Sequence, residues 1–165
     1  AGTPISDGML IVGQVLLVQT GLSVFLLSRK LSGSTVAGLA SAVAVWFLSP
    51  TPAYFVTWGR YPLVLGSALL PIALLGAIWL IERERLDIWV ILFSAATFAA
   101  LAFSQVRLIV FYFAFIAVYL VSFWQVHRRA PINRRSFYRL ALLGVSAICL
   151  GWVWIGALIM RGSTL

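Results

Sequence analysis

The sequence predicts an all-α, polytopic membrane protein with six transmembrane helices and both chain ends on the extracytoplasmic side. Hydrophobic residues make up 62% of the 165 residues and charged residues only 10%, whereas a soluble domain has about 25% charged residues. Six apolar stretches are long enough, or nearly long enough, to cross a bilayer. Nine of the twelve Lys and Arg residues lie in alternate gaps between these stretches. Because cytoplasmic loops carry the excess of Lys and Arg, those gaps are predicted to be cytoplasmic.

The predicted spans follow the apolar stretches. They are residues 9–27, 34–48, 62–81, 86–103, 108–126 and 140–160. The second span is short, roughly 24 Å against a ~30 Å hydrocarbon core, because Ser49-Pro50-Thr51-Pro52 must end it. We therefore expect residues 53–61 to complete that crossing as a short interfacial helix. In the third span, Pro71 predicts a kink.

The longest apolar stretch must fold back on itself. Residues 86–126 are interrupted only by Ser104-Gln105-Val106-Arg107, and as one helix they would be about 62 Å long, twice the core thickness. We therefore predict a tight reversal at this tetrapeptide, which makes the fourth and fifth spans an antiparallel hairpin. In the second span, Gly38, Ser41 and Ala42 form a face of small residues that permits close approach of another helix.

The net charge of +8 raises the question of nucleic-acid binding, but the positive charges follow the ends of the spans. We therefore predict membrane lipids as partners and no nucleic acid. The candidate contacts with anionic lipid head groups lie between the fifth and sixth spans and are Arg128, Arg129, Arg134 and Arg135. His127, beside them, is interpreted as an interfacial polar residue rather than a haem or chlorophyll ligand.

The middle of every predicted span lacks Asp, Glu, Lys and Arg, which argues against a proton pump or an ion-coupled transporter. The sequence contains no cluster of Cys and His residues, so no metal site is predicted. It also contains none of the glycine-rich nucleotide-binding motifs and no nucleophile elbow. The sequence therefore predicts no cofactor and no catalytic residue, and it leaves open whether the protein is an enzyme.

Two arginines lie on the predicted extracytoplasmic side, against the positive-inside bias. Arg60 belongs to an aromatic segment in which Tyr54, Trp58 and Tyr61 form a predicted interfacial loop. Arg107 lies in the predicted tight reversal. Two guanidinium groups at this boundary favour capture of a phosphate or a carboxylate. The alternative is that each arginine extends to the interface only to keep its charge hydrated.

The residues around Arg60 carry a resemblance to a known family. The segment 52–66, with Trp58-Gly59-Arg60-Tyr61-Pro62 at its centre, continues to Leu69-Leu70-Pro71 and is preceded by Asp7-Gly8, Gln14 and residues 27–34. It resembles the central transmembrane region of large bacterial and archaeal polytopic membrane proteins. Those proteins are similar to the GT-C glycosyltransferases, which use polyprenyl-phosphate sugars. The resemblance covers most of the first 80 residues.

This resemblance implies a location in the bacterial or archaeal inner (cytoplasmic) membrane, with a lipid-linked phosphate near Arg60 and Arg107. In the family, the catalytic Asp or Glu belongs to a large outer loop, whereas Asp7 is the only acidic residue on the predicted outer side. We therefore expect the membrane portion of a GT-C-like protein. It would handle a lipid-linked sugar phosphate at the extracytoplasmic face without being catalytic by itself.

Residues 1–165 are expected to form a single transmembrane domain that is a portion of a longer protein, whose other transmembrane helices would be its partners. The alternative is an accessory or structural transmembrane subunit of a larger respiratory or photosynthetic complex. Its 14% aromatic content and its faces of small residues would then serve contacts with protein, lipid or pigment.

Overall fold

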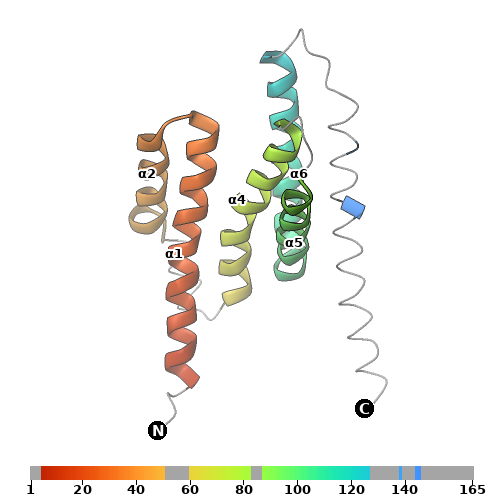
Figure 1. Ribbon diagram of the computed structural model, residues 1–165. Helices are drawn as coiled ribbons and strands as arrows, with labels where there is room; N and C mark the ends of the chain where they lie inside the picture. Colours follow the sequence, from red (N-terminus) through yellow and green to blue (C-terminus); the bar gives the residue numbers. More distant parts are fainter. Residues whose placement is uncertain (1–4, 51–59, 83–86, 127–137, 139–143, 146–165) are drawn as a thin grey trace, which may run out of the picture.

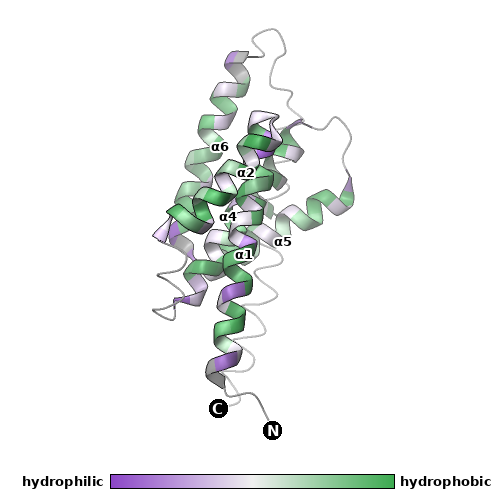
Figure 2. Ribbon diagram, turned by 90° about the vertical axis from the view of Figure 1, so that its left-hand side faces the viewer, coloured by the Kyte–Doolittle hydropathy of each residue, from purple (hydrophilic) through white to green (hydrophobic). Residues whose placement is uncertain are grey.

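The computed structural model describes residues 5–50, 60–82, 87–126, 138, 144 and 145. Every regular element in these ranges is helical, which confirms the all-α prediction for this part of the chain (Figure 1). The elements are α1 (Ile5–Ser32), α2 (Thr35–Val43), the π-helix η1 (Ala44–Leu48), α4 (Tyr61–Glu82), α5 (Ile88–Ser104) and α6 (Val106–Val126). Apolar residues run along most of the length of these helices (Figure 2).

Two helices are long and apolar enough to cross a membrane by length and composition, namely Asp7–Ser32 within α1 and Tyr61–Glu82. Thr35–Leu48, Ile88–Ser104 and Arg107–Phe123 are shorter apolar helices. The sixth predicted span, residues 140–160, lies outside the described residues except for helical positions 144 and 145. The number of spans and the side on which the chain ends lie therefore stay predictions.

A two-residue link joins α1 to α2 at the basic end of α1. Gly33 has a φ of +68°, a left-handed conformation that glycine adopts without steric cost, and its N–H donates to the carbonyl of Arg29 at 2.9 Å. Ser34 then caps α2 by accepting from the N–H of Ala37. The tight link places α2 beside α1, where the small residues Gly38 and Ala42 are buried. A Cβ on Gly38 would lie 2.9 Å from the ring of Phe25 on α1, so the predicted close approach is confirmed.

The second apolar stretch ends after Leu48, as predicted, but it does so through a π-helical turn that the sequence did not predict. Ser49 is extended (φ −91°, ψ 113°), and its N–H donates to the carbonyl of Ala44 at 2.8 Å, the five-residue spacing of a π-helix. Trp46, inside this turn, donates from Nε1 to the carbonyl of Leu17 on α1 at 3.2 Å. Its indole lies against Gly21 of the same helix.

The predicted reversal between the fourth and fifth apolar stretches is present. Helix α5 ends at Ser104, and Gln105 is extended (φ −158°, ψ 96°) before α6 begins. Phe98 and Tyr112 each lie seven residues from Gln105, and their ring centroids are 4.8 Å apart. In one continuous helix these positions would be separated by about 21 Å, so α5 and α6 form a helical hairpin.

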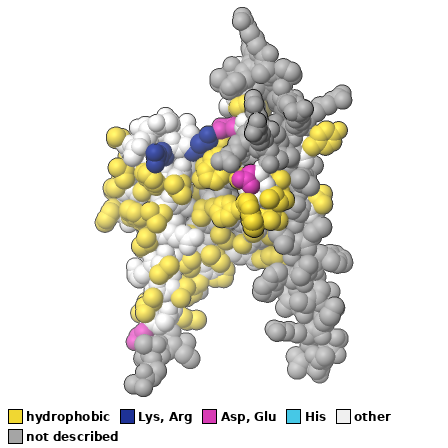
Figure 3. Space-filling model, in the orientation of Figure 1, with side chains coloured by type: hydrophobic (Ala, Val, Ile, Leu, Met, Phe, Trp, Pro, Cys, Tyr) yellow, Lys and Arg dark blue, Asp and Glu magenta, His cyan; other side chains and the backbone are white. Residues whose placement is uncertain are grey.

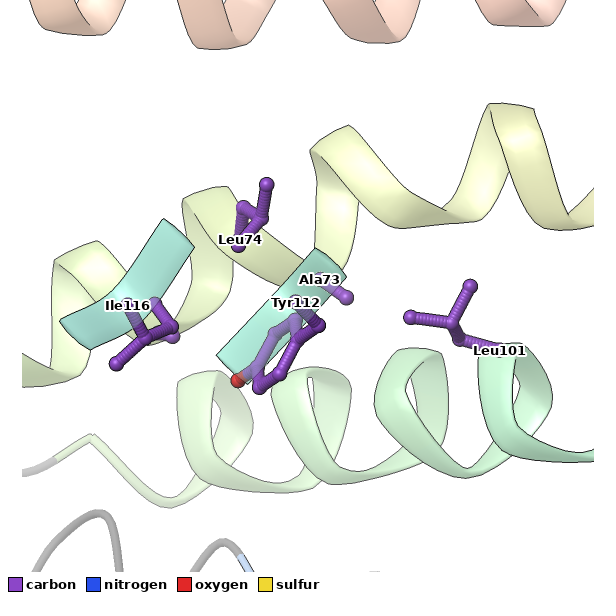
Figure 4. Packing of buried hydrophobic residues seen from close by; sticks show 6 residues of the cluster. Ala73, Leu74, Leu101, Tyr112 and Ile116 are labelled. Atoms are coloured by element: carbon purple, nitrogen blue, oxygen red, sulfur yellow. The ribbon is translucent and has the colours of Figure 1, made fainter. Parts of the chain in front are cut away.

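Helix α4 is the most buried described helix and lies between α1 and the α5–α6 hairpin (Figure 1). It continues without interruption through Pro71, which is buried. Its neighbours approach closely because it carries small residues, and a Cβ on Gly76 would lie only 2.6 Å from Oγ of Ser94 on α5. Helices α4, α5 and α6 share one hydrophobic cluster (Figure 4). Its buried members are Ala73, Leu74, Ala77, Leu101, Tyr112 and Ile116.

The contact of Trp46 with α1 depends on the missing side chain of Gly21. Gly21→Ala would place a methyl group inside the space of the indole, so Trp46 must move and give up its bond to Leu17. We expect the free energy of unfolding in detergent micelles to fall by roughly 1–3 kcal/mol. Gly8→Ala in the same helix is the matched control, because nothing lies within 4 Å of its Cβ. Equal stability of the two variants would contradict this packing.

The hydroxyl of Tyr112 is buried in the cluster and has no hydrogen-bond partner in the part of the chain that the structure describes. A buried hydroxyl without a partner costs about 1–3 kcal/mol, whereas the ring itself packs against Phe98. Tyr112→Phe is therefore expected to leave the unfolding free energy unchanged or to raise it, as measured by chemical denaturation in micelles. A decrease of more than about 1 kcal/mol would mean that the hydroxyl makes a bond of ordinary strength.

Candidate functional site

Arg60 lies at the start of α4, where the predicted aromatic segment meets the helix. Its carbonyl accepts from the N–H groups of Leu63 at 3.0 Å and Val64 at 3.3 Å, and its side chain is exposed. Tyr61 is the first helical residue and is half-buried. Pro62 follows in the first turn, where its missing N–H leaves no helical bond unmade. Tyr54 and Trp58 lie outside the described residues.

Arg107 lies in the first turn of α6. Gln105 links the two helices of the hairpin, since its N–H donates to the carbonyl of Leu101 at 2.9 Å and its carbonyl accepts from Leu108 at 3.0 Å. The side chain of Arg107 is exposed. The first amides of α6 have no acceptor within their own helix, and they add partial positive charge at the end where Arg107 lies.

Gly66 brings the starts of α4 and α6 together. A Cβ on this residue would lie 2.7 Å from Cδ1 of Leu108 and 3.2 Å from Cβ of Gln105, so the first turn of α6 touches the second turn of α4. Arg60 is six residues before Gly66, roughly 9 Å along the helix. Arg60 and Arg107 therefore lie at the same end of two neighbouring helices. Sequence reasoning missed that Gln105, a half-buried polar residue, contacts α4 at Gly66.

A second polar cluster connects α1, α4 and α6 at the opposite end of the bundle. Glu82, the last residue of α4, forms an ion pair through Oε2 with Nζ of Lys30 on α1. Its other oxygen, Oε1, accepts a hydrogen bond of 2.6 Å from the hydroxyl of Tyr119 on α6. Basic and acidic side chains lie side by side at this end (Figure 3). We call these three residues the Glu82 cluster.

The Glu82 cluster also fixes the direction of α1 relative to α4. Lys30 and Glu82 lie near the carboxyl ends of their helices, so α1 and α4 are parallel. Asp7 precedes Lys30 by 23 residues, and Arg60 precedes Glu82 by 22. Asp7, an exposed residue in the first turn of α1, therefore belongs to the same end of the bundle as Arg60 and Arg107.

Within the part of the chain that the structure describes, the buried polar side chains of α1 and α5 bond to backbone carbonyls of their own helices. Thr20 donates to the carbonyl of Leu16, Ser23 to that of Thr20, and Ser94 to that of Val90, at 2.7–2.8 Å. Such bonds satisfy a hydroxyl in an apolar environment. Among the described residues, no group of three His, Cys, Asp or Glu side chains could hold a metal ion. The charged side chains that the structure describes lie at the two ends of the bundle.

The four arginines of the basic loop, Arg128, Arg129, Arg134 and Arg135, lie outside the described residues. Comparisons of the chain with models of protein families, with curated protein sequences and with solved structures give no match.

Proposed function

We propose that the chain is the membrane portion of a GT-C-like protein and binds the phosphate of a lipid-linked sugar through Arg60 and Arg107. The site lies at the extracytoplasmic face of a bacterial or archaeal inner membrane, and the chain is not catalytic by itself. The observation that carries this proposal is the placement of the two arginines at adjoining helix starts, which the contact of Gly66 with Gln105 and Leu108 brings together.

The exposed surface of the helices supports placement in a membrane. Many large apolar side chains are exposed, among them Ile11 on α1, Phe47 on η1 and Phe111 on α6, at 61%, 78% and 64%. A monomeric soluble protein rarely exposes contiguous apolar surface on this scale, whereas lipid covers it without cost. We propose six spans with both chain ends outside, which places Arg60 and Arg107 at the outer boundary and the Glu82 cluster at the inner one.

The chemistry of the outer end suits a phosphate. Each guanidinium group offers paired N–H donors that match two phosphate oxygens. The starts of α4 and α6 add the positive ends of two helix dipoles. Asp7 is the one acidic side chain that the described residues place at this end, and a glycosyl transfer needs a carboxylate positioned at the acceptor. Binding of the lipid-linked donor is therefore the proposed activity, with the remainder of the transfer site supplied by the rest of a longer chain.

An accessory subunit of a larger membrane complex is the second candidate. It is favoured by an apolar stripe along the outer side of α2 and η1, at the edge of the bundle. Val36, Leu39, Val43 and Phe47 are exposed there and recur at helical spacing. The stripe suits a neighbouring protein helix as well as lipid, so binding of a lipid-linked phosphate is the property that separates the two candidates.

In both cases, we propose that the basic loop around Arg128 contacts anionic lipid head groups.

The topology is tested by thiol labelling in a Cys149→Ser background. Ser32 and Pro62 are exposed residues on opposite ends of the bundle, so Ser32→Cys should be protected from a membrane-impermeant reagent in intact cells and Pro62→Cys should react. After lysis, both should react. Labelling of Ser32→Cys from outside would overturn the proposed orientation.

The proposed site is tested by binding of a polyprenyl-phosphate analogue to the purified chain in nanodiscs. Arg60→Lys and Arg107→Lys keep the charge but lose the paired N–H donors, so each should weaken binding about tenfold, equivalent to about 1.4 kcal/mol. Arg29→Lys is the matched control, because Arg29 is equally exposed at the other end of the bundle. The same affinity in all four proteins would favour the accessory subunit.

A further inference from the structure

Helix α6 presents a single stripe of residues to its neighbours. On this stripe, Tyr112 and Ile116 belong to the buried cluster and Leu108 packs against it. Tyr119 lies on the same face, one helical step farther along. The apolar part of this contact is non-directional. The contact of Leu108 with Gly66 favours the observed register at the start of α6. Farther along the helix, the apolar contacts alone would distinguish poorly between this register and one displaced by a helical turn, 5.4 Å.

The last position of the stripe is different because its contact is directional. The hydroxyl of Tyr119 donates to Oε1 of Glu82 at 2.6 Å, and a displacement of one turn would carry the two groups beyond hydrogen-bonding distance. A polar contact at one position of an otherwise apolar helix interface selects one register when the alternative leaves the polar groups apart, and this contact lies at the exposed edge of the interface. Tyr119 thus adds a directional contact at the end of α6 that is far from Gly66.

Lys30 contacts the second oxygen of the Glu82 carboxylate. Lys30 and Tyr119 hold different oxygens of Glu82, so the carboxylate is fixed between α1 and α6. About a third of each charged side chain is exposed (34% for Lys30 and 31% for Glu82), and an ion pair at such a position adds little stability. Its effect is therefore on the geometry of the carboxylate rather than on the free energy of unfolding.

We propose that the Glu82 cluster sets the register of α6 against α4 and thereby the position of Arg107 relative to Arg60. Arg107 precedes Tyr119 by 12 residues on one continuous helix, so a shift of α6 by one turn moves Arg107 by the same 5.4 Å. Tyr119, Glu82 and Lys30 are then positioning residues for the anion site at the far end. The effect of the register on ligand binding rests on the proposed function. The assignment of the register of α6 against α4 does not.

The register is measured by pulsed dipolar spectroscopy on the full chain in nanodiscs. Spin labels at Pro62→Cys and Val110→Cys, both exposed positions near the starts of α4 and α6, report the distance between these helices in a Cys149→Ser background. The parent protein should give one narrow distribution. Tyr119→Phe and Glu82→Ala should add a second population, displaced by up to about 5 Å. An unchanged distribution in both variants would overturn the proposal.

The chain contains a matched control for the loss of one hydroxyl. Tyr112→Phe makes the same substitution on the same face of α6, but the hydroxyl that it removes has no hydrogen-bond partner among the described residues. It should leave the label distance unchanged, and a shift equal to that of Tyr119→Phe would also overturn the proposal. Lys30→Met keeps the bond of Tyr119 and should broaden the distribution less than Glu82→Ala.

Binding of the polyprenyl-phosphate analogue, measured on the same variants without labels, tests the link to the outer site. Tyr119→Phe should weaken binding about as much as Arg107→Lys does, and Tyr112→Phe should not. A shifted distance with unchanged affinity would overturn the link between register and site. If the parent protein binds no analogue while the distance still shifts, the proposed function fails and the register assignment stands.

Discussion

The arrangement of the described helices depends on how closely α5 and α6 can approach α4. Gly66 admits the first turn of α6, and Gly76 admits Ser94 of α5, each at a distance that any side chain on the glycine would prevent. Between them, Ala73 and Ala77 are buried in the shared cluster. In the membrane setting that we propose, water drives no association between helices, so such close contact is the main source of attraction. A helix with large residues at these positions would hold α5 and α6 farther away.

The two ends of the bundle are organised by different forces. At the end that we assign to the outside, Arg60 and Arg107 are exposed and belong to two helices that are in contact at Gly66. At the other end, Glu82 directly joins Lys30 and Tyr119. The guanidinium groups at the first end suit the oxygens of a phosphate, whereas the charges at the second end form an ion pair that joins two helices. We place the proposed site at the first end because two arginines lie there at the starts of helices in contact.

Local rules explain which features could be predicted from the sequence. The end of the second apolar stretch at Leu48 follows from Pro50, and the reversal at Gln105 follows from the length of the apolar run and the bilayer thickness. The positive-inside rule assigned Arg60 and Arg107 to one side, and the structure places them at one end of the bundle. The contact between the helices that carry Arg60 and Arg107 could not be predicted. It depends on Gly66 meeting a turn about 40 residues farther along the chain.

The same local rules could not predict contacts between residues that are far apart in the sequence. Glu82 meets Lys30 and Tyr119 across 52 and 37 residues, and the sequence shows only an acidic residue among basic ones. The π-helical turn at Ala44–Leu48 likewise has no local signal, since its Trp46 is placed by a carbonyl of α1. Hydropathy predicts which segments are helical. It does not predict which helix faces are in contact or the register of one helix against another.

The ion pair of Lys30 and Glu82 has a consequence for the order in which the chain assembles. Lys30 ends the first helix, whereas its partner ends α4 and is synthesised 52 residues later. In the membrane orientation that we propose, Arg29 and Lys30 carry two full positive charges during this interval, which hold this end of the α1–α2 pair at the cytoplasmic surface. When α4 arrives, Glu82 neutralises one of them. In this orientation, the charge that orients the nascent chain thus becomes, in the finished protein, part of the ion pair between α1 and α4.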